Sequence, residues 1–412
     1  MKNAPNSISH QFRKNVFNGY VVFAILLSLA WYFFAFSKQS DFIVFYRAAN
    51  NFLNSWNLNR GSDDFYVYKY FFFNVIPILP FTIFPLKIAQ SVFVGVNFLF
   101  LVWFYKLILP ILKKTSIFSK KSVRYLGAVL ILLLFKYQIR EIELGQVNLI
   151  ATVFALLSVI YLSKGKTFAT VFCFSFAILW KPYYLAFGLF FLCLRKWKVL
   201  FGVAGFFLAT HLLAILVWSP DYILSTYIDL FNMLKGQEMS FLTGRDETSY
   251  RSFFVKMFRF SKERAIHFGN IFSILSLLLY YFIGNKKRKF IESNLSSSLF
   301  FASTLIMFLP ILSPQGWHYL FQCAGFLHAF LFLWLKNNGA KSFFNKVIAI
   351  QLFLIGITVF DLMGRKLYGL YSFLGFQTLN YLILFYCALI LIFTEFKQPS
   401  NFFKLKNSKV QR

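Results

Sequence analysis

The sequence predicts an all-α polytopic membrane protein, a bundle of about 12 transmembrane helices. Hydrophobic residues make up 58% of the 412 residues and charged residues only 14%, with 60 Phe. Apolar runs recur along the whole chain, and about 20 residues at about 1.5 Å rise each suffice to cross a hydrocarbon layer of about 30 Å. Clusters of Lys and Arg separate these runs, as cytoplasmic loops separate the helices of a membrane protein.

The formal net charge of +29 at pH 7 would suit a nucleic-acid-binding protein, but the positions of the charges argue against that class. A nucleic-acid site needs its basic residues on one face, whereas here they are divided among the segments between apolar runs. We therefore predict no nucleic-acid partner. The basic clusters lie at 113–124, 164–166, 195–198, 286–289 and 336–346, with a basic tail from residue 397.

With the N-terminus in the cytoplasm, a series of about 12 crossings places every basic cluster inside and returns the C-terminus to the cytoplasm. Every acidic residue except Glu292 and Glu395 then faces outward. The first run, 17–37, shows no small-residue cleavage site, so we expect a retained helix rather than a signal peptide. The predicted location is the inner (plasma) membrane, with the active site facing the periplasm or exterior. The predicted spans are 17–37, 88–110, 125–138, 147–163, 167–180, 183–194, 198–217, 266–284, 295–312, 319–335, 346–362 and 372–394.

Two segments decide this topology. The run 71–86 is apolar but short and rich in proline, so we expect a helix that lies against or dips into the outer leaflet instead of crossing. The run 167–194 is expected to form two short helices that meet at Lys181-Pro182. One long kinked span there would invert everything downstream.

The chain is interpreted as one integral membrane domain, because it shows no internal repeat and no low-complexity linker. Two of its outer segments are long enough to build a site, one after the first span and one after the seventh. The predicted units are the first span 17–37, the outer catalytic loop 38–87, the core spans 88–217, the large outer loop 218–265, the C-terminal spans 266–394 and the basic cytoplasmic tail 395–412.

Asp41 is the first acidic residue of the chain and stands just after the first span. The segment that follows predicts an amphipathic helix in the plane of the membrane surface. Asp41 at its start is either a helix cap or a catalytic carboxylate, and the two roles are compatible because a helix N-terminus favours the ionised form. The apolar face of this helix consists of Phe42, Phe45, Tyr46, Ala49, Phe52, Leu53 and Trp56.

Two further outer segments carry polar side chains. Lys69 stands among tyrosines, next to Tyr68, and either snorkels to the membrane surface or meets a lipid-borne phosphate. Gln146 and Asn148 follow a glycine that allows a tight turn. Their amides either bind sugar hydroxyls or belong to an ordinary polar turn between helices.

Three later positions complete the candidates. Lys181 lies between two apolar helices, where a lysine is costly and indicates a functional site unless it snorkels to the surface. Trp317 and His318 share an outer turn, where the tryptophan either stacks on a sugar or lipid or belongs to an interfacial aromatic belt. Arg251, in a polar stretch of the large loop, either faces solvent or binds a phosphate.

The sequence predicts neither a metal nor any other cofactor. It contains no H-E-x-x-H, P-loop or paired-cysteine signature, so ATP-driven work by this chain is not expected. All four cysteines lie in apolar runs, which argues against a disulfide framework and against a zinc site.

The order of these features resembles glycosyltransferase family 87, whose members are polyprenol-phosphate-mannose-dependent mannosyltransferases of the GT-C fold. The resemblance runs from about residue 38 to 335, and its most specific pieces are DFIVFYRAA, GQVN, WKP and SPQGWH. Two pieces depart from the family pattern. The chain has YFF at 70–72 where the family usually has consecutive prolines, and ETS at 247–249 where it tends to have Asn-Gln-Ser.

The resemblance implies an inverting transfer of a sugar, mannose in the family, from a polyprenyl-phosphate donor to a lipid-linked or cell-envelope glycan. Asp41 would be the catalytic carboxylate, with assistance from His318. Lys69 and Lys181 would lie near the donor phosphate, with Arg251 as a third candidate. The residues expected to bind the sugar or the acceptor are Tyr68, Gln146, Asn148 and Trp317. The expected partners are the polyprenyl-phosphate sugar, a glycolipid or glycan acceptor, and membrane lipid.

Two other functions remain open at this point. A lipid-linked oligosaccharide flippase or other transporter would also need many spans, but transporters tend to place charged residues near the bilayer midplane and often contain repeats. Here the candidate polar groups gather at one face. An O-antigen-type polymerase or ligase would rest its chemistry on Arg245 and Arg251 rather than on Asp41.

Overall fold

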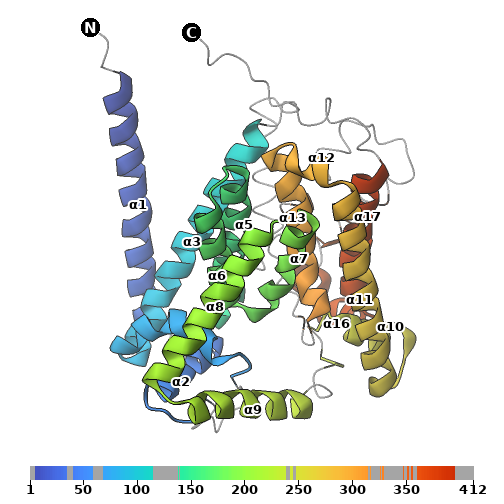
Figure 1. The fold of residues 1–412 in the computed structure, drawn as a ribbon, viewed down its shortest axis with the longest axis horizontal. Coiled ribbons are helices and arrows are strands. Elements are labelled where there is room, and N and C mark those ends of the chain that lie inside the picture. The colour runs from blue at the N-terminus through green and yellow to red at the C-terminus, as the bar shows by residue number, and fades with distance from the viewer. Residues whose placement is uncertain are drawn as a thin grey trace.

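A computed structural model describes most of the chain (Figure 1), and it contains helices and no strand among the residues it describes. The described residues are 5–34, 40–58, 68–114, 138, 140–237, 242–244, 247–313, 316, 325, 327–328, 347, 350–351, 354–355 and 360–394. The predicted all-α class is therefore confirmed for this part of the chain.

The helices that form the bundle have roughly aligned axes (Figure 1). At one edge the first helix packs along the third, and the central helices pack on one another. These helices are α1 (Pro5–Phe34), α3 (Leu86–Lys114), α5 (Asn148–Ser163), α6 (Thr167–Trp180), α8 (Trp197–Val217), α11 (Lys262–Lys286), α13 (Leu295–Leu312) and α17 (Phe376–Thr394).

Other helices lie at the two ends of this bundle (Figure 1). α2 (Ser40–Leu53) and α9 (Pro220–Gln237) lie at the lower end of this view, whereas α12 (Arg288–Glu292) lies at the upper end. The first two belong to predicted outer loops, and α12 overlaps a basic cluster predicted to be cytoplasmic. The two kinds of predicted loop thus fall at opposite ends of the molecule.

Among the described residues, five helices are long and apolar enough to cross a membrane. They are Leu86–Pro110, Trp197–Val217, Lys262–Lys286, Leu295–Leu312 and Phe376–Thr394. The predicted spans 125–138 and 319–335, and most of 346–362, lie outside the described residues. The predicted count of about 12 therefore stays a prediction. The apolar surface of these helices nevertheless marks the chain as a membrane protein.

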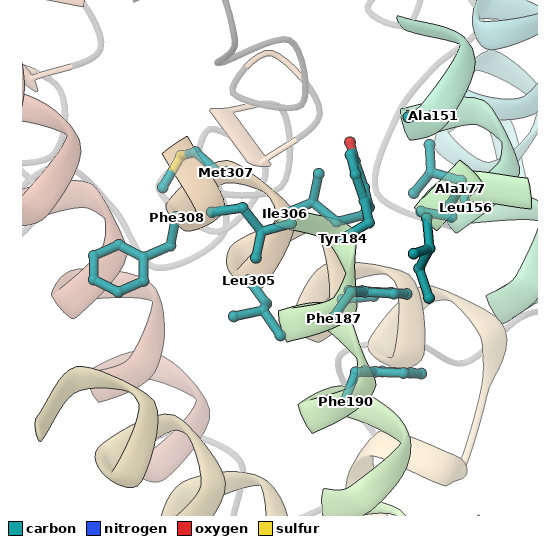
Figure 2. Packing of buried hydrophobic residues seen from close by; sticks show 14 of the residues in the cluster. Ala151, Leu156, Ala177, Tyr184, Phe187, Phe190, Leu305, Ile306, Met307 and Phe308 are labelled. Atoms are coloured by element: carbon teal, nitrogen blue, oxygen red, sulfur yellow. The ribbon is translucent and has the colours of Figure 1, made fainter. Parts of the chain in front are cut away.

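The core is built around α13, whose residues from Ser296 to Ile311 are all buried. Figure 2 shows Tyr184 and Phe187 between α13 and the helices α5 and α6. Inside a bilayer, helices associate through such close packing because lipid is as apolar as the side chains. The outer surface of α8, by contrast, exposes Leu216 and other large apolar side chains, as lipid contact requires.

The proline-rich run 71–86 forms the 3-10 helix η1 (Phe72–Ile83). Prolines inside it lack an N–H donor, which accounts for the absence of a regular α-helix here. The amide nitrogen of Asn74 donates to the carbonyls of Ile178 and Leu179 at 2.8 and 2.9 Å. These bonds fasten η1 to the last turn of α6.

The run 167–194 is divided as predicted. α6 ends at Trp180, and after Lys181 the chain continues as the 3-10 helix η2 (Pro182–Phe187) and then α7 (Gly188–Cys193). The proline starts the new segment because it fits the first turn of a helix but not its interior. The remaining short helices are α10 (Tyr250–Phe258) in the large loop and α16 (Phe360–Phe373).

Candidate functional site

Asp41 lies in the first turn of α2. The helix forms because apolar side chains recur at helical spacing, and Phe42 and Phe45 are buried against the rest of the protein. The start of this apolar face is packed, whereas at its far end Leu53 and Trp56 are 49% and 45% exposed. Because α2 ends at Leu53, the tryptophan no longer follows the helical spacing. The packed part of α2 fixes the main chain that carries Asp41.

Gln146 reaches Asp41 from a tight turn before α5. Gly145 has a φ of 67°, in the left-handed region that favours glycine. The N–H of Gln146 closes the turn by donating to the carbonyl of Glu141 at 2.9 Å. From this turn, Nε2 of Gln146 donates a hydrogen bond to Oδ2 of Asp41. The turn predicted from the glycine is thus present, and it positions the candidate base.

Asn148 extends this contact into a buried chain of polar groups. Its Nδ2 lies 2.5 Å from Oε1 of Glu141 and 3.3 Å from Oε1 of Gln146. Its Oδ1 accepts a hydrogen bond from the hydroxyl of Tyr183 at 2.8 Å. Binding of sugar hydroxyls by Gln146 and Asn148 stays a prediction. In the structure both amides are buried, and together they orient the carboxylate of Asp41.

The segment from Tyr68 to Tyr70 passes beside α2. The hydroxyl of Tyr68 donates to the carbonyl of Phe71 at 3.0 Å, and burial raises the pKa of Tyr68 well above its ordinary value. The ring of Tyr70 stacks on Phe45 of α2, with 5.5 Å between the ring centroids. These contacts hold Lys69, which lies between the two tyrosines, close to α2.

Lys181 occupies the break between α6 and η2 and is only 3% exposed. Its Nζ donates to the hydroxyl of Tyr70 at 2.6 Å and lies 4.8 Å from the centroid of that ring. The ring of Phe45 is the next aromatic face, at 5.8 Å. A buried ammonium needs such hydrogen-bond and cation–π partners. Lys181 therefore points into the protein instead of snorkelling to the surface.

Charges of both signs act on Lys69. Burial lowers the pKa of its ammonium to about 8. The carboxylates of Asp41 and Glu247 oppose this shift, and the positive charge of Lys181 adds to it. Two acids and a second lysine, each from a different segment, therefore lie within electrostatic reach of Lys69.

Glu247 is the site residue that sequence reasoning missed. It is 1% exposed, and its Oε1 accepts hydrogen bonds from the N–H groups of Gly316 at 2.7 Å and Ser249 at 3.2 Å. Burial raises the pKa of Glu247 to about 7, although these hydrogen bonds and the charge of Lys256 oppose the shift. Two signals in the sequence could have indicated Glu247. It is one of only 14 acidic residues, and it lies in the ETS segment that departs from the family pattern.

Gly316 ties the late outer turn to the large loop. Both the N–H and the hydroxyl of Thr248 donate to the carbonyl of Gly316, at 2.5 and 2.8 Å. A Cβ on Gly316 would lie 2.0 Å from the carbonyl oxygen of Pro310, so this close approach needs glycine. The candidates Trp317 and His318 follow in the sequence and lie outside the described residues.

Arg251 engages α11 instead of joining the two lysines. Its Nε and one terminal nitrogen donate to Oδ1 of Asn270 at 3.0 and 2.7 Å. The charges that act on Lys69 come from other residues. Arg245, the other arginine considered in this loop, lies outside the described residues. The structure thus groups Lys69 with Lys181 and places Arg251 apart.

The described residues contain no group of three His, Cys, Asp or Glu side chains that could hold a metal ion. Cys173, Cys193 and Cys387 are buried and free. Independence from metals and cofactors stays a prediction.

Comparison with known proteins identifies the family. The family model of glycosyltransferase family 87 matches residues 68–314, more than half of the chain. The matched range includes Lys69, Lys181 and Glu247, whereas Asp41 precedes it. No curated protein and no solved structure matches the chain. With its apolar helices and this match, the chain belongs to glycosyltransferase family 87 and is a membrane glycosyltransferase.

Proposed function

We propose that this protein transfers a sugar, mannose in the first instance, from a polyprenyl-phosphate donor to a hydroxyl of a lipid-linked or cell-envelope glycan. The anomeric configuration inverts. The observation that carries the proposal is that the charges of Asp41 and Lys181 both act on Lys69, which lies beside α2. The reaction needs a base for the acceptor and cations for the departing phosphate. Family membership supports the transfer of a sugar.

Asp41 acts as the base in a single displacement. It takes the proton of the acceptor hydroxyl while that oxygen forms a bond to the anomeric carbon. The bond from this carbon to the phosphate oxygen breaks, and polyprenyl phosphate leaves with the electron pair. The hydrogen bond from Gln146 and the first turn of α2 favour an oriented, ionised carboxylate.

The two lysines stabilise the leaving group. Negative charge grows on the phosphate as the bond breaks, and preorganised cations lower the energy of that state. With a pKa of about 8, Lys69 is mostly charged at neutral pH. Tyr70 holds the ammonium of Lys181 through a 2.6 Å hydrogen bond, so this cation is fixed before the donor arrives.

The donor's isoprenoid tail lies among the apolar helices, and its head group lies at the end of the bundle that carries α2 and α9. We place this end at the outer face of the plasma membrane, toward the periplasm or exterior. The basic segment around α12 lies at the opposite end (Figure 1). Basic loops are usually cytoplasmic, which supports this orientation.

The test uses membranes that contain the wild-type protein or Asp41→Asn. Each is given a panel of radiolabelled polyprenyl phosphates carrying mannose, another hexose or a pentose. We expect the wild type to transfer label from one donor into glycolipid or glycan. Asp41→Asn should lower turnover about 10²–10⁴-fold while donor binding and thermal stability persist, because it removes a positioned base.

Asp229→Asn is the matched control for this experiment. Asp229 lies on α9, at the same end of the bundle, and accepts a hydrogen bond from Asn57 at 2.6 Å. Its substitution should leave transfer close to the wild-type rate. Near-normal transfer by purified Asp41→Asn protein would rule out Asp41 as the base.

A further inference from the structure

Glu247 has one buried carboxylate oxygen that its surroundings do not satisfy. The residue is 1% exposed, and within the described part of the chain its Oε2 makes no hydrogen bond. A buried carboxyl oxygen without a hydrogen bond is costly, and each such atom in a folded protein calls for an explanation, of which a functional role is one. We therefore expect a hydrogen-bond donor to meet Oε2 at some stage of function.

Within the described residues, the groups around Glu247 leave Oε2 without a hydrogen bond. Oε1 already accepts the N–H groups of Gly316 and Ser249, which fixes the plane of the carboxylate. Nζ of Lys256, on the following helix α10, donates at 2.5 Å to the backbone carbonyl of Glu247 and not to its carboxylate. One oxygen thus holds the late outer turn, while the other remains an acceptor of fixed orientation.

The position of this acceptor links it to the candidate site. The charge of Glu247 acts on Lys69, as does the charge of Asp41. Lys69 is partly exposed, so the cluster opens to its surroundings on that side. A ligand that binds Lys69 through a phosphate would therefore lie in the region on which both carboxylates act.

We propose that Glu247 is a sugar-binding residue whose Oε2 accepts a hydrogen bond from a hydroxyl of the substrate. The inference rests on the proposed function in one respect, namely that the substrate is a sugar. The hydroxyl belongs either to the donor's sugar or to the acceptor glycan. A buried acceptor of this kind also discriminates between sugars, because a sugar that lacks the matching hydroxyl leaves the carboxylate unpaired.

Glu247→Gln is the decisive variant. The amide oxygen of glutamine can still accept the N–H of Gly316, so the turn is retained, but an NH₂ donor replaces the acceptor at the second position. A residue that only holds the turn would tolerate this change. Glu143→Gln is the matched control, since Glu143 lies in another predicted outer segment and pairs with Arg140 at 3.0 Å.

Binding is measured on purified protein in lipid nanodiscs by titration calorimetry, in two arms. The donor arm compares polyprenyl-phosphate mannose with bare polyprenyl phosphate. The acceptor arm uses soluble methyl mannoside and methyl glucoside. We expect Glu247→Gln to lose about 10- to 100-fold in affinity for the sugar in one arm, the value of a hydrogen bond to a charged group, and to keep its affinity for bare polyprenyl phosphate. The affected arm identifies the source of the hydroxyl.

Unchanged affinity in both arms would overturn the inference, as would lost turnover with unchanged sugar affinity. If Glu247→Gln does not fold, monodeoxy forms of the mannosyl donor and the methyl glycosides are titrated against the wild type. A tenfold or larger loss at one hydroxyl supports the inference, and a flat panel overturns it. Failure of the proposed function would appear separately, as normal transfer by Asp41→Asn.

Discussion

Gln146 donates a hydrogen bond to the carboxylate of Asp41, joining residues that are 105 positions apart in the sequence. Gln146 precedes α5, whereas Asp41 lies in the first turn of α2. Nδ2 of Asn148 donates to the amide oxygen of Gln146, which turns the NH₂ group of that amide toward Asp41. The family match covers Gln146 and Asn148 but begins after Asp41. The contact therefore connects the matched region to the candidate base.

Removing the hydrogen bond from Gln146 should slow sugar transfer more than it weakens binding of the polyprenyl-phosphate sugar. Gln146→Leu keeps the approximate size of the side chain but removes the hydrogen bond that Gln146 donates to Asp41. We expect kcat to fall about 10- to 100-fold, with little change in KM for the donor, because a misplaced base acts mainly on the chemical step. Initial rates of sugar transfer at several donor concentrations separate the two parameters.

Gln138→Leu controls for the general cost of removing a buried glutamine. Nε2 of Gln138 lies 2.5 Å from the hydroxyl of Tyr105, in a contact that does not involve Asp41. Its loss should affect stability more than kcat. An equal fall of kcat in both variants would show that the Gln146–Asp41 contact has no special role.

The lowered pKa of Lys69 predicts weaker donor binding at alkaline pH. Below its pKa of about 8 the ammonium is charged and attracts the donor phosphate, and above it the charge is lost. KM for the donor should therefore rise up to about tenfold as the pH is raised from about 7 to about 9. Transfer rates across this range provide the measurement.

Lys69→Arg isolates this effect, because an arginine keeps its charge throughout the range. Its KM should stay nearly constant where that of the wild type rises. Glu247, with a pKa of about 7, is mostly ionised above about pH 8, so the upper half of the profile reports mainly on Lys69. Parallel profiles for the two proteins would contradict the assignment.

Local signals in the sequence were sufficient for several parts of the site. The helix after Asp41 was predicted from its apolar spacing, the turn before Gln146 from Gly145, and the break at Lys181 from the proline that follows it. Each depends on a few neighbouring residues, whose conformational preferences can be read without knowledge of the tertiary structure.

The contacts between distant segments could not be predicted in this way. The hydrogen bond of Lys181 to Tyr70 depends on how η2 and the loop before η1 pack. The sequence around Glu247 is typical of a solvated polar loop, whereas in the structure Glu247 is buried and bonded to Gly316. A side chain's partner and burial are tertiary properties, and they decide which polar residues form the site.

Asn74 is predicted to hold the end of α6, and with it Lys181, in place. Asn74→Ala removes both side-chain hydrogen bonds to the carbonyls of Ile178 and Leu179 and leaves these buried acceptors unsatisfied. We expect a loss of about 1–3 kcal/mol in stability together with a higher KM for the donor. Thermal unfolding in detergent and donor titrations test both parts.

Asn97→Ala is the control, because it removes a bond at 3.4 Å within its own helix. It should raise KM much less than Asn74→Ala, and an equal rise would contradict the role of Asn74 in positioning Lys181.

Gly316→Ala should disrupt the link between the large loop and the late outer turn. The new Cβ would lie 2.0 Å from the carbonyl oxygen of Pro310, so main chain has to move and the bond to Glu247 is lost. We expect a destabilisation of about 1–3 kcal/mol, the usual cost of overpacking, and reduced transfer. Gly205→Ala on α8 is the control, because a Cβ there meets nothing within 4 Å and alanine favours the helix by about 1 kcal/mol. Equal unfolding temperatures for the two variants would show that the close contact at Gly316 does not exclude a larger residue.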